Sequence, residues 1–180
     1  PDLQRAARPD YAIGCKRVLI TSDWLPTLAR PHVDLVTAPI AEVVPEGVRS
    51  ADGVVHEADL IIFGTGFTAT DFLAPMEVVG RGGASLRETW AGGAQAYFGL
   101  TVPRFPNMFV MYGPNTGHGT GSAVDMLEAQ AGYLAQAIGA LASGAAERLE
   151  VREDVHEAFQ AEIAERMTST VWASGCGSWY

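Results

Sequence analysis

The chain is short of basic residues and of long apolar runs, and each shortage excludes a class of protein. Its 180 residues carry 12 Lys and Arg against 21 Asp and Glu, which gives a formal net charge of −9. Nucleic-acid binders need a basic surface that displaces counterions from phosphates, so we expect no nucleic-acid partner. No uncharged apolar run reaches the roughly 18 residues of a membrane span, so we expect no membrane partner either.

Cysteine is also scarce. Cys15 and Cys176 stand far apart in the sequence, and no Cys-x-x-Cys motif occurs. We therefore expect no disulfide framework, and this cysteine usage is typical of a reducing, cytoplasmic compartment. The four histidines show no metal-ligand spacing, so we expect no bound metal.

The composition is that of a well-packed globular protein. Hydrophobic residues make up 48% of the 180 residues and charged residues 18%, and this length fits one ordinary domain or parts of two. The sequence begins Pro-Asp-Leu-Gln-Arg, without an initiator Met and without the apolar core of a signal peptide. We interpret the chain as an excerpt from a longer polypeptide.

Short apolar runs separated by Gly and Pro predict a set of strands. Residues 40–44, 47–49 and 54–57 alternate with two turns, at Pro45–Gly47 and Ala51–Gly53, which predicts antiparallel hairpins. The most apolar run is Ala58–Phe63, and it ends directly at Gly64, as a central strand covered on both faces does. Further buried strands are expected at residues 18–21, 33–37 and 107–112.

Two amphipathic helices are expected in the second half of the chain. The first begins after Ser122, an N-cap with Asp125 three residues later, and ends at Gly144, where a C′ glycine belongs. Its expected buried stripe is Val124, Leu127, Ala131, Leu134, Ile138 and Leu141. The second covers residues 154–167, where Asp154 and Glu157 imitate a capping box and the stacked residues are Val155, Phe159, Ile163 and Met167.

A glycine-rich loop precedes the first of these helices. Its four glycines in the nine residues from Gly113 to Gly121 let the backbone approach a ligand, and the following helix offers free N–H groups to an anion. The spacing matches neither a Walker loop nor Gly-x-Gly-x-x-Gly, so a ligand loop and an ordinary connection stay equally open. Of the four histidines, only His118 lies in this loop and could touch a ligand.

Lys16 and Arg17 are adjacent cations at the entrance of the expected strand 18–21. Neighbours on a strand project to opposite faces, so these two side chains would serve different sites. One could hold a phosphate, while Arg suits a planar or delocalised anion. Two solvated surface cations are the alternative interpretation.

Four runs of the sequence carry a family resemblance when taken together. They are PDYAIGCKRVLITSDWLPTLARPHVDLVT (Pro9–Thr37), HEADLIIFGTGF (His56–Phe67), PRFPNMFVMYGPNTGHG (Pro103–Gly119) and SWY (Ser178–Tyr180). In this order they resemble the C-terminal part of class B flavin-dependent monooxygenases, most closely the Baeyer–Villiger monooxygenases. The resemblance implies an α/β fold with two dinucleotide-binding domains. Residues 1–63 would be the C-terminal part of the NADPH-binding domain, and residues 64–180 the C-terminal part of the FAD-binding domain.

The resemblance also implies a reaction. In this family NADPH reduces FAD, dioxygen adds at the flavin C4a carbon, and the resulting C4a-peroxyflavin inserts one oxygen atom into a ketone or aldehyde. We therefore expect FAD and NADPH as cofactors, and O2 and a small ketone or aldehyde as substrates.

Site residues follow from the same resemblance. Lys16 matches the lysine that binds the 2′-phosphate of NADPH, and Arg17 matches the arginine that faces the flavin and steadies the negative peroxide. The segment Thr65, Gly66 and Phe67 matches the step near the flavin that links the domains. The segment Pro114, Asn115 and Thr116 matches the loop against the isoalloxazine ring, with the positive end of the long helix directed at that ring. Trp179 matches a tryptophan that contacts the ribose of the nicotinamide cofactor.

Several family features are absent from the chain. These are the glycine fingerprints of both nucleotide domains, the Phe-x-Gly-x-x-x-His motif and the acidic partner of the arginine that Arg17 matches. All would lie upstream in a full-length member, so we expect the missing N-terminal portion to be a partner of this chain. The chain alone should bind FAD poorly and catalyse nothing. Oxygenation of nitrogen or sulfur, and a non-catalytic remnant of the fold, stay open as alternatives.

Overall fold

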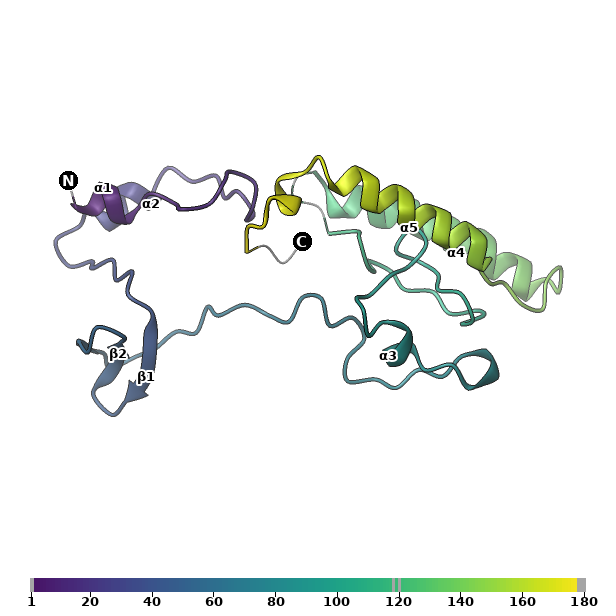
Figure 1. Ribbon diagram of the computed structural model, residues 1–180, viewed down its shortest axis with the longest axis horizontal. Coiled ribbons are helices and arrows are strands. Elements are labelled where there is room, and N and C mark those ends of the chain that lie inside the picture. The colour runs from purple at the N-terminus through teal and green to yellow at the C-terminus, as the bar shows by residue number, and fades with distance from the viewer. Residues whose placement is uncertain (1, 118, 120, 178–180) are drawn as a thin grey trace. The chain divides into compact units, whose positions relative to one another are not determined.

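The computed structural model describes residues 2–117, 119 and 121–177, and these divide into two compact units (Figure 1). The first unit consists of the residues up to Asp10 together with Leu19–Phe67. The second consists of Tyr11–Val18 together with the chain from Thr68 onward. The short segment Tyr11–Val18 therefore belongs with residues far from it in the sequence.

The first unit is built around an antiparallel meander. It contains α1 (Asp2–Ala6), α2 (Trp24–Leu28), β1 (Ile40–Val44), β2 (Gly47–Ser50) and β3 (Val55–Glu57), with the strands in the order β1-β2-β3. Val48 on β2 lies opposite both Val43 and His56, so the two hairpins expected from the sequence are confirmed. Gly47 is required in the first turn because a Cβ there would lie 2.1 Å from the carbonyl oxygen of His56.

The second hairpin turn is held by a polar network. The buried Ser50 hydroxyl donates to Asp52 Oδ1 at 2.5 Å and lies 3.1 Å from His56 Nε2. Asp52 Oδ1 also accepts from the Val54 amide at 3.2 Å. The Ser50 hydroxyl, helped by the Val54 amide, lowers the pKa of Asp52. Because Ser50 lies between the other two side chains, the network closes a turn and is not arranged as a nucleophile–base–acid chain.

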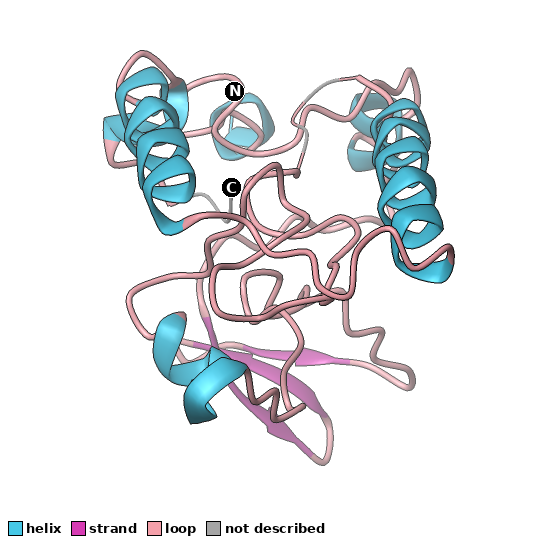
Figure 2. Cartoon of the chain, turned by 90° about the vertical axis from the view of Figure 1, so that its right-hand side faces the viewer, coloured by secondary structure: helices cyan, strands magenta, loops and turns pink. Residues whose placement is uncertain are grey.

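The second unit holds the longer helices. Its elements are η1 (Arg81–Gly83), α3 (Leu86–Thr89), α4 (Ala123–Ala142), α5 (Glu153–Met167) and η2 (Val171–Ser174). The two long helices, α4 and α5, run on opposite sides of the loops that precede α4 (Figure 2). A small apolar core lies in those loops and consists of Ala84, Leu86, Ala96, Val102 and Phe105.

Helix α4 begins and ends where the sequence predicts, but only part of its expected buried stripe is buried. The Ser122 hydroxyl accepts from the Asp125 amide, and Gly144 follows the helix with φ 75°. On the expected buried stripe, Val124 and Ile138 are 62% and 54% exposed, while Leu127 and Leu134 are half-buried. Among the described residues no helix combines the length and apolar composition needed to cross a membrane.

Helix α5 buries the expected side chains but is capped differently. Its stacked residues are all half-buried, namely Val155, Phe159, Ile163 and Met167. The expected capping box at Asp154 is wrong, because the N-cap is Arg152 and the carboxylate of Asp154 pairs with the Arg152 guanidinium. That ion pair lowers the pKa of Asp154.

Four expected strands do not form. Residues 18–21, 33–37, 58–63 and 107–112 are irregular, and the β1-β2-β3 sheet is the sheet present in the described part of the chain. Residues 107–112 are interrupted because Asn107 and Tyr112 have φ values of 59° and 54°, which a strand cannot contain. The other three runs pair with no neighbouring strand among the described residues, and a strand needs such a partner for its backbone hydrogen bonds.

The expectation of no disulfide framework is also wrong. Cys15 and Cys176 form a disulfide across a sequence separation of 161 residues, with their Cα atoms 6.2 Å apart. The indole nitrogen of Trp172 donates to the carbonyl oxygen of Gly14 at 3.2 Å beside this bond. Sequence spacing could not reveal the pairing, because it arises from the packing of Tyr11–Val18 against η2.

Candidate functional site

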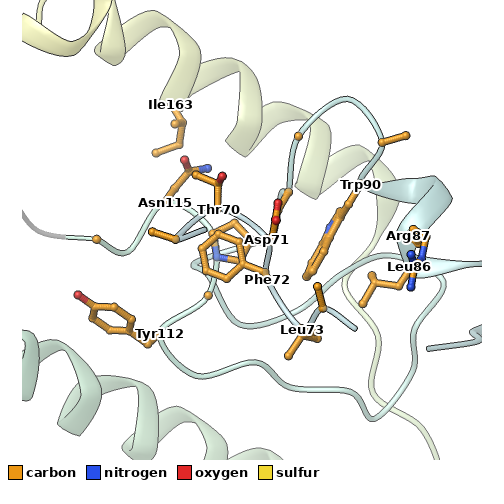
Figure 3. Close-up of a pocket in the computed structure, with 18 of the residues that line it drawn as sticks. Thr70, Asp71, Phe72, Leu73, Leu86, Arg87, Trp90, Tyr112, Asn115 and Ile163 are labelled. Atoms are coloured by element: carbon orange, nitrogen blue, oxygen red, sulfur yellow. The ribbon is translucent and has the colours of Figure 1, made fainter. Parts of the chain in front are cut away.

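A cavity of about 1050 Å³ opens in the second unit (Figure 3). Three segments and two helices surround it. The first segment is residues 69–76, the second runs from Leu86 to Ala94, and the third is the loop from Tyr112 to Gly117. The end of α5 and η2 complete the wall with Ile163, Arg166, Met167, Thr170 and Trp172. A site of this size is in the range of small-molecule and cofactor pockets.

Four aromatic side chains line the cavity. Phe72 and Trp90 stand side by side in Figure 3, edge to face, with ring centroids 6.3 Å apart. The Trp90 indole donates to the carbonyl oxygen of Gln95 at 2.8 Å, which fixes the orientation of the ring. Tyr112 and Trp172 add two further rings. The wall therefore offers a flat ligand several rigid aromatic surfaces.

The predicted ligand loop forms one side of this cavity. Pro114 and Thr116 are buried, whereas Asn115 is exposed and its side chain lies at the cavity in Figure 3. The Thr116 hydroxyl donates to the Gly113 carbonyl at 2.6 Å. A Cβ on Gly99 would lie 2.1 Å from Thr116 Cγ2, so the loop fits closely against that glycine. The buried residues thus hold the loop, and Asn115 is left to meet a ligand.

The cation pair is placed in the same unit as the cavity. Lys16 and Arg17 are both exposed, and Lys16 Nζ lies 4.6 Å from the ring centroid of Tyr11. No strand follows them, so the argument that strand geometry sends the two side chains to opposite faces loses its basis. Gly14, two residues before Lys16, accepts the hydrogen bond from Trp172 on the cavity wall. The pair is therefore linked to the wall through the backbone and does not itself line it.

Three further predicted site residues are not among the residues that line this cavity. Thr65, Gly66 and Phe67 belong to the first unit and are exposed, with Phe67 99% accessible. His118 and Trp179 lie outside the described residues. Among the described residues no group of three potential metal ligands comes together.

Two residues of the cavity wall, and Gln130 outside it, were not singled out from the sequence. Phe72 and Trp172 gave no signal beyond their aromatic character. Gln130 and Ala131 both lie between Leu127 and Leu134 on the helix, and the apolar Ala131 is the residue that the sequence pattern places on the buried stripe. Gln130 is 6% exposed, and Ala131 is exposed.

Comparison with known proteins finds relatives along the whole chain, although no protein-family model matches it. A Baeyer–Villiger monooxygenase of Streptomyces coelicolor is 43% identical over all of this chain and 35% of its own length. One of Pseudomonas aeruginosa is 40% identical over 34% of its length. The FAD-binding monooxygenase ktnD of Aspergillus niger is also 40% identical, over 30% of its length. The chain thus spans about a third of the length of the curated relatives it matches.

Solved structures that resemble this chain are also monooxygenases. A cyclohexanone-bound cyclohexanone monooxygenase in the rotated conformation matches 97% of this chain and 34% of its own, with a TM-score of 0.86 and 28% identity. OTEMO in complex with FAD and NADP matches 99% of this chain and 36% of its own, with a TM-score of 0.83 and 27% identity. The resemblance to the Baeyer–Villiger monooxygenases is therefore confirmed, and the fold corresponds to part of a flavin monooxygenase.

Proposed function

We propose that this chain, which resembles the Baeyer–Villiger monooxygenases from end to end, is the C-terminal portion of an FAD- and NADPH-dependent monooxygenase. The complete enzyme would insert one oxygen atom from O2 into a ketone or aldehyde. Residues 1–63 would complete an NADPH-binding domain, and residues 64–180 an FAD-binding domain. Two findings support this proposal. All of this chain aligns with a relative about three times as long, and a similar solved structure is a complex with FAD and NADP.

The observation that carries the proposal is the cavity bordered by the Pro114–Thr116 loop. Its volume of about 1050 Å³ and its aromatic wall suit a planar, largely apolar ring system. Asn115 carries an amide that can donate and accept hydrogen bonds at the polar edge of such a ring. The residues present therefore fit FAD, and the loop that matches the family's flavin contact is the one at the cavity.

We assign Pro114, Asn115 and Thr116 to flavin binding, and we extend the assignment to Thr65, Gly66 and Phe67 because they match the family's step near the flavin. FAD, when bound, supplies the redox chemistry that activates dioxygen. Arg17 would place a fixed positive charge where negative charge develops, and such a charge is usually a large catalytic contribution. Lys16 would bind the 2′-phosphate of NADPH, and Trp179 the ribose of the same cofactor.

Isotope labelling of the complete polypeptide tests the reaction class. The enzyme is supplied with NADPH and ¹⁸O₂ and offered a cyclic ketone, an amine and a sulfide in separate reactions. We expect one ¹⁸O atom in the lactone by mass spectrometry, with Arg17→Ala lowering lactone formed per NADPH consumed by about 100-fold. Label found only in the amine or sulfide product would contradict the ketone reaction. No NADPH consumption and no labelled product would favour a non-catalytic remnant.

A further inference from the structure

Gln130 places a buried amide in the middle of the apolar helix α4. Its side chain is 6% exposed, and both ends of the amide are hydrogen-bonded. The oxygen Oε1 accepts from the backbone N–H of Tyr112 at 3.0 Å, and Nε2 donates to the carbonyl oxygen of Phe98 at 3.2 Å. A single side chain thus ties two loop segments to one helix.

The two residues whose backbone groups bond to Gln130 both have an unfavourable backbone conformation. Phe98 has φ 51° and Tyr112 has φ 54°, in the left-handed region that costs free energy for any residue other than glycine. Such conformations persist when surrounding contacts over-determine them, and they cluster at functional sites. The Gln130 amide supplies one such contact to each residue.

The two segments meet at the cavity loop. Tyr112 opens the loop, and Asn115, which follows three residues later, has φ 62°. Both side chains lie at the cavity in Figure 3. Gly99, the residue after Phe98, fits against Thr116 so closely that a Cβ would overlap it. Movement of either partner of Gln130 would therefore move the loop.

We propose that Gln130 is a positioning residue, which holds the Tyr112–Thr116 loop in the orientation that the flavin ring requires. It does not line the cavity and acts through the backbone of Tyr112 and Phe98. This inference rests on the proposed function, because the role of the loop is to contact FAD.

The test uses the complete polypeptide and three variants. Gln130→Leu removes both hydrogen bonds at similar volume, whereas Gln130→Glu keeps an oxygen that can accept from Tyr112. Gln136→Leu is the matched control, because Gln136 is an exposed glutamine of α4 whose side chain donates within its own helix, to the Gly132 carbonyl at 3.3 Å. Hydrogen exchange of the FAD-free protein measures how well the backbone amides of the loop are protected. The visible circular dichroism of bound FAD reports the surroundings of the flavin ring.

We expect Gln130→Leu to raise the exchange rate of the Tyr112 amide about tenfold or more, since it removes a buried hydrogen bond. The Val110 amide, bonded to the Leu100 carbonyl at 2.8 Å, should keep its rate. In Gln130→Leu the circular dichroism of bound FAD should change, and kcat should fall about tenfold. Gln130→Glu should restore the protection of the Tyr112 amide. Gln136→Leu should match the wild type in all three measurements.

Two results would overturn this inference. One is unchanged exchange at Tyr112 in Gln130→Leu. The other is faster exchange at Tyr112 with unchanged FAD dichroism and kcat, because the loop's position would then not matter to the flavin. Wild-type protein that binds no FAD would instead overturn the proposed function itself, so the wild-type control tells the two failures apart.

Discussion

Cys15, which directly precedes Lys16 and Arg17, forms a disulfide with Cys176. The Cys15 side chain is 0% exposed, and the adjacent Gly14 carbonyl accepts from Trp172, a residue of the cavity wall. Two contacts therefore fix the backbone that leads into Lys16 and Arg17. For a proposed oxyanion partner such as Arg17, a fixed backbone reduces the reorganisation needed during the reaction.

We predict that loss of either cysteine destabilises the protein by the same amount. Cys15→Ser and Cys176→Ser should each lower the free energy of unfolding by about 2–4 kcal/mol, because the disulfide restricts the unfolded chain. The double variant should be no less stable than either single one. Urea unfolding measures all three. Titration of two free thiols in the native, non-reduced protein would show that this bond is absent.

A second residue-scale prediction concerns Gly99. Gly99 and Gly82 have φ values of 68° and 69°, but a Cβ on Gly99 would overlap Thr116, whereas nothing lies within 4 Å of one on Gly82. Gly82→Ala should therefore cost about 1 kcal/mol of backbone strain, and Gly99→Ala about 2 kcal/mol more. Thermal unfolding measures both. Equal costs would mean that the loop moves away freely.

At the scale of elements, the sequence predicted what is locally encoded. Ser122 and Gly144 bound α4 correctly because capping uses only neighbouring residues. The β1-β2-β3 meander was predictable for the same reason. The buried face of α4 was not, because the choice between Gln130 and Ala131 depends on Phe98 and Tyr112, which are distant in sequence. The cavity wall depends on similar long-range contacts, so the sequence predicted the loop but not its aromatic surroundings.

Glu150, in the segment that joins α4 to α5, gives a pH-dependent prediction. Its Oε1 accepts from the Arg104 amide at 2.7 Å and from the Arg81 guanidinium at 3.1 Å, and Arg81 in particular lowers the pKa of Glu150. The stabilisation is therefore present above the unfolded-state pKa of about 4.3 and is lost as the pH falls through the folded-state pKa.

We expect Glu150→Gln to reduce the loss of stability between neutral and acidic pH. Arg81→Gln should do the same, because it removes the main cause of the shift. Urea unfolding at a series of pH values measures the slope for each variant. A wild-type slope in both variants would mean that the ion pair contributes nothing to folding.

At the scale of the whole molecule, the first unit leaves apolar runs uncovered. Leu60, Ile62 and Phe63 are 77%, 85% and 71% exposed, although their run reads as a central strand. Exposed apolar runs of this kind mark a surface that another segment covers. Because the chain spans about a third of its relatives, we expect upstream sequence of the same polypeptide to supply the neighbouring strands and the rest of the nucleotide sites. This would account for the three expected strands that have no partner among the described residues, at residues 18–21, 33–37 and 58–63, but not for residues 107–112, which positive φ values interrupt.

Titration with FAD tests the central claim most directly, namely that this chain forms one part of a shared flavin site. The complete polypeptide and the 180-residue chain are each titrated, and binding is followed by quenching of FAD fluorescence. We predict that the complete polypeptide binds one FAD tightly, while the chain alone binds about 100-fold more weakly or not at all. Equal, stoichiometric binding by the chain alone, or no binding by the complete polypeptide, would contradict the account.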